Sequence, residues 1–454
     1  MASGTTLEYC DRTDVGRRRS SNQDARAVLE PWDRELYRRR GWLFVVADGM
    51  GAHAAGELAS AIAAEQVPLV YEKLAPRSPP LALQQAIRQA NEEIHAKGES
   101  SLDLKGMGTT CTALAIVPRG ALVGHVGDSR AYRVRRGRIE QLSQDHSLVW
   151  EMQAQQSPGV ELALPKNIIT RSLGPHPAVK IDIEGPYPVE ADDIFVLCSD
   201  GLSGQVEDGE IGLLAGMLRP REAAAALVGL ALVRGGPDNI TVIVARAGPK
   251  EASKAAPADP PWPLTEQPPT AAPLPWRRLA TAAVSLFVAL VSFGVAKPLL
   301  TGWPDGAAPT AAGGPWGAGG MVAMLILALL AGLTFLAALL FAVLGFLGSG
   351  GQDGAALPVG KKLGSGPYRN HDCAPGADLV NGMVASVEAA LEGLAGPTRA
   401  RAEDSLRRAR GRLAAGDHEA AVEAVAAAVA TYAGAVEAAR SAAGRDGTAA
   451  ADAG

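Results

Sequence analysis

Two long stretches without a charged residue divide this chain of 454 residues and set most of its organisation. They run over Leu279–Ala296 and Ala318–Leu347. A helix of roughly 20 apolar residues is long enough to cross a bilayer. Apolarity without a polar face is unusual for a helix of a soluble domain, although two buried core helices are the alternative. We therefore expect two transmembrane helices, over 277–300 and 318–347.

Charges beside these stretches predict their orientation. Arg277 and Arg278 precede the first, Lys361 and Lys362 follow the second, and the segment between them lacks Lys and Arg after Lys297. Lys297 stands at the outer end of the first span, where its side chain can reach the headgroups. Basic residues favour the cytoplasmic side, so both termini are expected inside. The first thirty residues contain no apolar segment of the kind found in secretory signals.

The remaining chain divides by composition. We expect a globular domain over 1–247, a Pro- and Ala-rich linker over 248–276, an external loop over 301–317, a flexible linker over 348–376, a helical region over 377–443 and a disordered tail over 444–454. The helical region is Ala-rich, and a GDH break near its middle is typical of a helical hairpin or of one tetratricopeptide-like unit. Either form could bind a protein partner.

The first domain mixes strand and helix signals. The runs WLFVVA, TALAIV, IFVLCS and ITVIVA are typical of buried strands, and helical patterns cover Gly56–Leu74, Pro80–Ala96 and Asp208–Val233. VRRGRIEQL predicts a hairpin at Arg136 and Gly137, hence an antiparallel sheet. The expected fold class is α+β.

Charge and cysteine content exclude several functions. The chain has 43 Lys and Arg against 48 Asp and Glu, so it has no general basic field for nucleic acid. Its four cysteines are widely separated and form no C-x-x-C pair, which argues against a zinc site or a disulfide framework.

Acidic residues stand beside the ends of the apolar runs. They are Asp48 in FVVADGMGAH, Asp128 in GHVGDSRAY, Asp200 in VLCSDGLSG and Asp238 in GGPDNITVIV. Any one of them could simply form a turn. Carboxylates that converge repel one another unless a divalent cation neutralises them, and oxygen ligands without Cys or His suit Mg²⁺ or Mn²⁺.

In this order, the four elements closely resemble the signature of the metal-dependent serine/threonine protein phosphatases, the type-2C family in its bacterial form. DVGRRRSSNQDA, GTTCTALAI and ITRSLG extend the resemblance over about residues 6–246. It implies an α-β-β-α sandwich with a two-metal centre at one end of its sheets. The membrane is then a bacterial inner, cytoplasmic membrane.

The resemblance also implies individual roles for the acidic residues. Asp48 would bridge two Mn²⁺ or Mg²⁺ ions, and Gly49 would offer its carbonyl to one of them. Asp200 and Asp238 would complete the second ion's ligands. Asp128 would hold a third, weaker metal together with Asp200.

Further residues are implied around these ligands. Arg19 would bind the substrate phosphate, and Asp24 would bind a metal through water. Gln23 and Asn239 would also stand outside the direct ligands. Gln23 departs from the Glu that is common in bacterial members, and Ala52 replaces a common Gly.

The implied reaction is hydrolysis of phosphoserine and phosphothreonine on proteins by a water nucleophile that two metals activate. A serine/threonine kinase would be the opposing enzyme. The alternative is a weakly active, phosphatase-like signalling receptor, or a scaffold that acts through its C-terminal helices. Retention of Asp48, Asp200 and Asp238 favours the enzyme.

Overall fold

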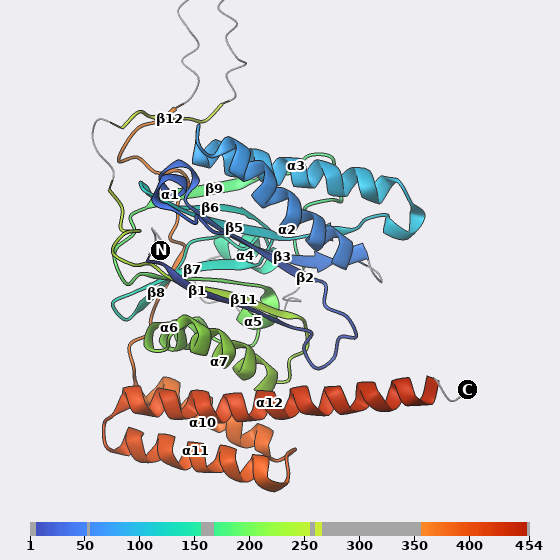
Figure 1. The fold of residues 1–454 in the computed structure, drawn as a ribbon, viewed down its shortest axis with the longest axis vertical. Helices are drawn as coiled ribbons and strands as arrows, with labels where there is room; N and C mark the ends of the chain where they lie inside the picture. The colour runs from blue at the N-terminus through green and yellow to red at the C-terminus, as the bar shows by residue number, and fades with distance from the viewer. Residues whose placement is uncertain (1–5, 52–54, 156–167, 255–258, 266–355, 452–454) are drawn as a thin grey trace, which may run out of the picture. The chain divides into compact units, whose positions relative to one another are not determined.

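Two antiparallel sheets packed face to face form the centre of the fold (Figure 1). A computed structural model describes residues 6–51, 55–155, 168–254, 259–265 and 356–451. The predicted spans and the loop between them lie outside the described residues. The described chain before and after this gap belongs to one compact unit.

The first sheet has the strand order β1-β11-β10-β7-β8-β14. Its strands are β1 (Glu8–Asp14), β7 (Arg130–Arg135), β8 (Arg138–Gln141), β10 (Ile194–Cys198), β11 (Ile240–Arg246) and β14 (Arg369–Asp372). The predicted hairpin joins β7 to β8, and Arg136 and Gly137 both have positive φ, at 51° and 73°. This backbone matches the twist of the flanking strands.

The second sheet has the order β2-β3-β5-β6-β9, and β4 pairs with β3. Its strands are β2 (Asp24–Leu29), β3 (Trp42–Met50), β4 (Gly108–Thr109), β5 (Cys111–Val117), β6 (Gly120–Val126) and β9 (Asp182–Tyr187). Trp42 and Phe44 of β3 face the other sheet, whereas Leu43 and Val45 face the helices. Burial on both sides explains why this strand is apolar without alternation.

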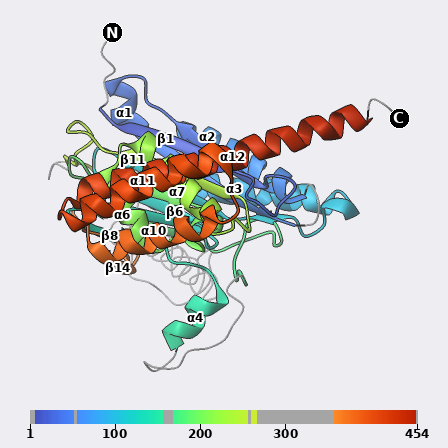
Figure 2. The same ribbon diagram turned by 90° about the horizontal axis from the view of Figure 1, so that it is seen from below.

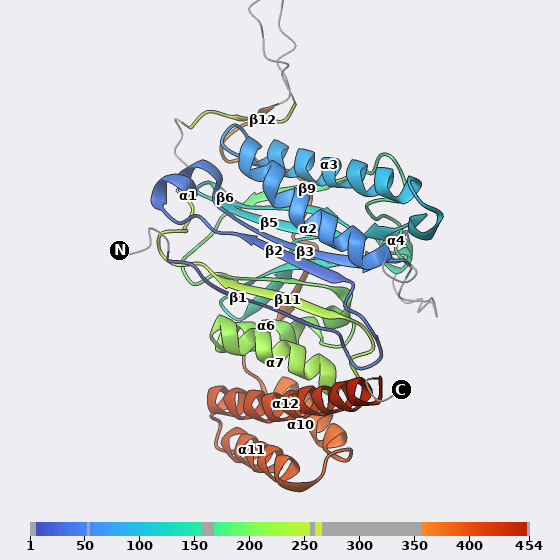
Figure 3. The ribbon, with the colours of Figure 1, turned by 45° about the vertical axis from the view of Figure 1, so that its right-hand side comes forward.

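Helices cover the outer face of each sheet (Figure 3). The second sheet is covered by α2 (Ala55–Leu74) and α3 (Pro79–Glu99), and the first by α6 (Asp208–Met217) and α7 (Pro220–Val233). The single helix expected over Asp208–Val233 is therefore two. Leu218 and Arg219 are extended, because the residue before a proline avoids helical backbone and Pro220 has no N–H to donate.

Shorter helical elements lie in the connections. They are α1 (Arg34–Arg40), the 3₁₀ helix η1 (Leu102–Leu104), α4 (Leu148–Gln155) and α5 (Asp200–Ser203). The expected α-β-β-α sandwich is thus confirmed for the first domain.

The C-terminal region forms a further helical layer on α7. It contains three helices, α10 (Ala377–Leu391), α11 (Gly396–Ala414) and α12 (His418–Ala451), where a hairpin was expected. Figure 2 shows α12 lying across α7. Val425 and Val429 of α12 are buried in the same apolar cluster as Leu227 of α7. The region is therefore packed on the sandwich.

The stretches expected to be linkers contribute to this unit. β12 (Trp262–Pro263) pairs with β13 (Ala356–Leu357), and β14 extends the first sheet beside β8. Glu251 is fully buried and accepts hydrogen bonds from the main chain and hydroxyl of Thr6. The linker predictions for 248–276 and 348–376 are therefore wrong for the described parts, which pair and pack.

One helix in the described part of the chain is long and apolar enough to cross a membrane, α12 over His418–Ala442. Its apolar residues Val425, Val429 and Tyr432 are buried against neighbouring helices. Helix α12 continues to Ala451, so most of the tail expected to be disordered from residue 444 is helical.

Candidate metal centre

The predicted acidic residues come from both sheets and meet at one end of the sandwich. Asp24 of β2 and Asp48 of β3 are partners in the antiparallel register. Asp200 follows β10, and Asp238 precedes the neighbouring β11. The Ser199 hydroxyl donates to Asp24 Oδ2 at 2.8 Å, which joins the end of β10 in the first sheet to β2 in the second.

Further hydrogen bonds fix the chain around these carboxylates. The Asp48 N–H donates to Thr110 Oγ1 at 2.9 Å, and that hydroxyl lies 2.7 Å from Ser129 Oγ. Asn239 Oδ1 accepts from the Gln23 N–H at 2.8 Å. Gln23 and Asn239, which are 216 residues apart, are thus in direct contact beside the carboxylates.

Burial and mutual repulsion disfavour the charged forms of these groups. Burial raises the pKa of Asp24 to about 6. Hydrogen bonds from Thr241 and Ser199 oppose this shift, and the charges of Asp200 and Asp238 add to it. Burial, followed by the charge of Asp200, raises the pKa of Asp128 to about 7.

Asp48 is at the centre of this repulsion. Its pKa is raised well above the usual value, first by burial and then by Asp24, Asp200 and Asp128. Burial and Asp238 also raise the pKa of Asp200, although a hydrogen bond with Asp48 opposes them. Arg19 and Arg130 lower the pKa of Asp200 but do not cancel this repulsion, because the pKa stays above its usual value.

The donor set fits a hard divalent cation. Asp24 Oδ1 and Asp128 Oδ1 are buried and make no hydrogen bond with the residues that the structure describes. No group of three acidic, His or Cys side chains among those residues stands ready to hold an ion as arranged. Asp238 instead accepts from Arg19 and from the Asn239 N–H. Uncompensated carboxylates repel, whereas an ion would draw these all-oxygen donors together, as Mg²⁺ and Mn²⁺ do.

Gly49 occupies a position that excludes a side chain. A Cβ atom there would lie 2.1 Å from the Gly56 carbonyl oxygen and 2.5 Å from that of Gln23. The Gly49 N–H donates to the same Gln23 carbonyl at 3.1 Å. The backbone after Asp48 is thus held close to two neighbouring segments, and only glycine fits.

Arg19 lies at the exposed edge of the carboxylates. Its Nη2 donates to Asp238 Oδ2 at 2.8 Å, and the two side chains are 51% and 32% exposed. The hydrogen bond that Arg19 donates to Asp238 raises the pKa of Arg19. Burial opposes this shift, and the charges of Asp238, Asp48 and Asp200 add to it. A guanidinium here can hold a phosphate group beside the carboxylates.

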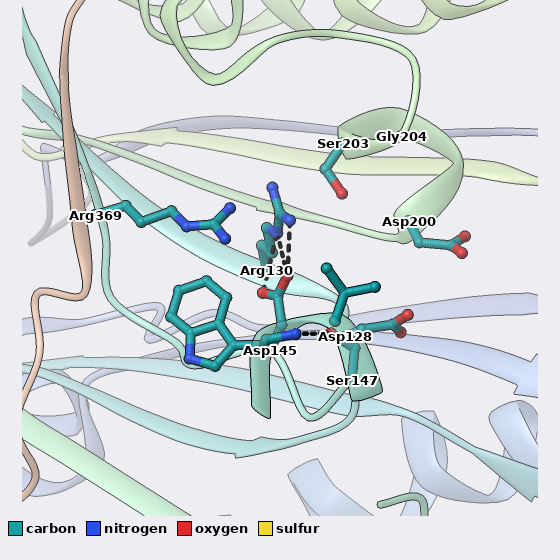
Figure 4. A pocket seen from close by; sticks show the side chains of 10 residues that line it. Asp128, Arg130, Asp145, Ser147, Asp200, Ser203, Gly204 and Arg369 are labelled. Carbon is teal, nitrogen blue, oxygen red and sulfur yellow. Dashed lines mark hydrogen bonds and ion pairs between the residues drawn. The ribbon is translucent and has the colours of Figure 1, made fainter. Parts of the chain in front are cut away.

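A cavity of about 300 Å³ opens beside Asp128 and Asp200 (Figure 4). Its far side is formed by Trp150 of α4 and Arg369 of β14, whose guanidinium carbon lies 4.1 Å from the indole centroid. Arg130 also lines it and donates to Asp145 Oδ2 at 2.7 Å. The cavity thus joins the candidate metal centre to a cationic and aromatic wall.

Sequence reasoning missed three residues of this wall. Arg130 could have been found, because it stands within GDSRAY two residues after Asp128. Trp150 had only a weak signal, as a lone aromatic residue in a polar segment. Arg369 had no local signal, since its position depends on pairing between β14 and β8, which are far apart in the chain.

Comparison with known proteins gives consistent matches over about half of the chain. Residues 16–229 match a family model described as Protein phosphatase 2C. The serine/threonine phosphatase stp of Listeria innocua is 35% identical over 241 residues, which are 51% of this chain and 93% of that protein. The serine/threonine protein phosphatase PstP of Mycobacterium tuberculosis is 35% identical over 246 residues, 53% of this chain and 45% of that protein.

Solved structures of similar proteins cover about half of this chain. The crystal structure of the M. tuberculosis serine/threonine phosphatase PstP/Ppp is 35% identical, with a TM-score of 0.46, and covers 53% of this chain and 99% of its own. A crystal structure of the PstP catalytic domain in complex with 2 manganese ions is 36% identical, with a TM-score of 0.45 and coverage of 53% and 98%.

Proposed function

Since this chain belongs to the protein phosphatase 2C family, we propose that it is a membrane-anchored, metal-dependent serine/threonine phosphatase acting on phosphoserine and phosphothreonine in proteins. The observation that carries the proposal is the convergence of partly or fully buried carboxylates from both sheets. The pKa values of Asp24 and Asp128 are raised to about 6 and about 7. When these carboxylates are ionised, their negative charges must be neutralised, and divalent ions supply the positive charge.

Two Mn²⁺ or Mg²⁺ ions fit this donor set, with Asp48, Asp200, Asp238 and the Gly49 carbonyl as ligands. Asp128 would hold a third, weaker ion with Asp200, while Asp24 would act through water. Bound ions supply an acidified water and neutralise charge on the phosphoryl oxygens. Gln23 and Asn239 hold the surrounding backbone through their mutual hydrogen bond at 2.8 Å.

Arg19 performs the substrate-binding step in this proposal. It is half exposed and already bound to a carboxylate oxygen of Asp238. A phosphate ester presents the same type of acceptor in a geometry that suits a guanidinium fork. Arg19 then holds the ester against the ligand carboxylates and offsets charge as the bond to the leaving oxygen breaks.

The cavity beside Asp128 supports a protein substrate. Residues next to the phosphorylated side chain have room along it, with Trp150 and Arg369 as contacts. We expect Arg369→Ala to raise KM for a phosphothreonine peptide roughly 3- to 10-fold, a loss typical of one interfacial contact, while p-nitrophenyl phosphate is little affected. The matched control is Arg138→Ala. Arg138 lies on the neighbouring strand β8, and its side chain donates a hydrogen bond to Asn370.

The uncharged segments support the membrane anchor. The chain leaves the described unit after β12 and re-enters at β13, and these two strands pair with each other. A segment that crosses a bilayer twice must return to the side from which it left. Adjacent entry and exit points, with basic residues flanking both segments, therefore favour two spans with the catalytic and C-terminal regions in the cytoplasm.

A serine/threonine kinase that phosphorylates the same proteins is the opposing partner in this proposal. The alternative, a scaffold acting through its C-terminal helices, requires that the catalytic residues be dispensable. The burial of Val425 and Val429 in a cluster shared with α7 favours helices that belong to the enzyme.

Hydrolysis by the full-length chain tests the function. Manganese-dependent hydrolysis of a phosphothreonine peptide is expected, and Asp48→Asn should abolish it while leaving the fold intact by circular dichroism. Full activity in EDTA, or in Asp48→Asn, would contradict the proposal. A reporter inserted within Pro304–Pro315 should be external, and a cytoplasmic reporter would exclude the two-span topology.

A further inference from the structure

The loop that carries Arg19 is bound to the turn that carries Asp238. It joins β1 to β2, and its Arg17 N–H donates to the Gly236 carbonyl at 2.6 Å. Gly16 has a φ of +77°, and a Cβ there would lie 2.0 Å from the Asp238 carbonyl oxygen. This side of the loop therefore has a fixed neighbour next to the candidate metal centre.

The other side of the loop is bound by the C-terminal helix α12. Arg440 Nη1 donates to Asp14 Oδ1 at 2.8 Å, and its Nη2 donates to the Gly16 carbonyl at 2.7 Å. Arg17 Nη1 in turn donates to the Tyr432 hydroxyl at 3.0 Å. Tyr432 and Arg440 are eight residues apart, or about two helical turns, so they lie on the same face of α12.

These contacts fix position more than they add stability. Arg440 and Asp14 are 33% and 23% exposed, so solvent screens their attraction. A guanidinium that binds a carboxylate and a carbonyl at once nevertheless restricts both the distance and the angle of the loop. Asp14 Oδ1 also accepts from the Gly16 N–H at 2.8 Å, which makes Asp14 the common anchor.

Open space lies beside the Arg440 end of this contact, whereas Tyr432 is buried in the apolar cluster that α12 shares with α7. A cavity of about 510 Å³ lies beside the contact, lined by Arg17, Val233, Leu394, Tyr432, Val436 and Arg440 among others. The loop and α12 are therefore in contact here through hydrogen bonds made by the polar ends of side chains. Truncation of Arg440 removes hydrogen bonds without leaving a void in a close-packed interior.

We propose that α12 positions the Arg19 loop for phosphate binding, which makes Arg440 and Tyr432 positioning residues of the active site. This inference rests on the proposed function, in which Arg19 binds substrate phosphate. Both residues lie beyond residue 229, where the family match ends. A movement of α12 would reach Arg19 through Asp14, Gly16 and Arg17, which gives the C-terminal region a physical route to the catalytic site.

Steady-state kinetics of the full-length chain with Mn²⁺ test the proposal. Arg440→Ala should raise KM for a phosphothreonine peptide roughly 3- to 10-fold, with a smaller change in kcat, because coupled contacts of this kind have effects of that size. The inhibition constant of inorganic phosphate should rise by the same factor. Arg440→Lys should recover part of the loss, and Tyr432→Phe should give a smaller loss.

A matched control and a double variant identify the route. Arg399→Ala removes an arginine from an exposed ion pair with Glu403 on α11 and should leave KM unchanged. In an Arg19→Ala background, Arg440→Ala should add no further increase in KM, since the group it positions is absent. Additive effects of the two substitutions would instead indicate a role independent of Arg19 and overturn the proposal.

The outcomes also separate this inference from the function on which it rests. If the unmodified chain hydrolyses the peptide with Mn²⁺ and Arg440→Ala matches Arg399→Ala in KM, the positioning role is wrong and the phosphatase assignment stands. If the unmodified chain shows no metal-dependent hydrolysis, both are wrong.

Discussion

Carboxylates at the end of this sandwich are largely withdrawn from water, with Asp128 buried and Asp24 and Asp48 partly buried. Asp24, Asp48 and Asp128 have pKa values raised chiefly by burial, then by their neighbours. A structural ion-pair network would surround each of them with cations, but Asp24 Oδ1 and Asp128 Oδ1 make no hydrogen bond within the described chain. Such a site costs stability unless an ion is bound.

Stability without metal should therefore depend on pH. The pKa values of Asp24 and Asp128 are raised to about 6 and about 7, against roughly 3.9 in an unfolded chain. Their contribution to stability is fully present below about pH 4 and is lost as the pH rises through these values, because the folded state binds more protons. We expect Mn²⁺ to raise the melting temperature more at about pH 7.5 than at about pH 5.

Thermal unfolding of the full chain in EDTA and in Mn²⁺ at both pH values measures this effect. An equal rise in melting temperature at the two pH values would mean that the ion does not replace protons on these carboxylates.

Single residues were predictable where a local pattern marked them. Asp48, Asp128, Asp200 and Asp238 each stand beside an apolar run, and the structure brings them together. Arg369 and Arg440 could not be found in this way. Their positions are set by strand pairing and helix packing with segments 228 and 426 residues away, and neither carries a distinguishing local sequence.

At the scale of elements, α7 is the junction between the sandwich and the C-terminal helices. Its sequence PREAAAALVGLALV is apolar on nearly every side, since one face meets the first sheet and another meets α12. A Cβ at Gly229 would lie 2.4 Å from Val429 Cγ1 on α12. This glycine permits the close approach of the two helices.

Two glycine substitutions should have opposite effects. Gly434→Ala in α12 has no atom within 4 Å of the new Cβ, so we expect a gain in the free energy of unfolding of about 0.5–1 kcal/mol from helix propensity. Gly229→Ala gains the same propensity but pushes against Val429, and the steric cost of overpacking, about 1–3 kcal/mol, should make it net destabilising. Urea unfolding measures both.

Equal stabilisation by the two substitutions would show that α7 and α12 are not in close contact in solution. The kinetic effect is a second check, because displacement of α12 by Gly229→Ala should also raise KM as Arg440→Ala does.

The elements themselves followed from periodicity and turn residues. The apolar runs became β3, β5, β10 and β11, and the hairpin at Arg136 formed as expected. The break between α6 and α7 was missed, although Pro220 marked it. Strand β14 was missed for a different reason: its sequence RNHD is polar, and it forms because it is an edge strand that β8 can pair.

At the scale of the whole molecule, the catalytic unit is assembled from chain on both sides of the uncharged segments. The first domain expected over 1–247 is completed by β14, which lines the cavity through Arg369, and by α12, which contacts the Arg19 loop. Amino-acid composition predicted a domain followed by linkers. It carries no information on which distant segments pair in the folded structure.

Truncation should expose this dependence. A chain of residues 1–247 lacks the helices that cover α7, so apolar groups such as Leu227 and Val228 lose their cover. We expect a lower melting temperature and stronger binding of an apolar dye than in the full chain, together with a raised KM. Removal of residues 444–454 alone is the control. Equal melting temperatures for 1–247 and the full chain would contradict this account.

The central claim is that distant carboxylates converge to bind divalent ions, and manganese binding to the full-length chain tests it most directly. Equilibrium binding followed by electron paramagnetic resonance should give about two strongly bound Mn²⁺ per chain, as a two-metal site requires. Asp404→Asn on the exposed surface of α11 should leave this number unchanged, and Asp48→Asn should reduce it. An absence of bound Mn²⁺, or the same number in Asp48→Asn, would contradict the claim.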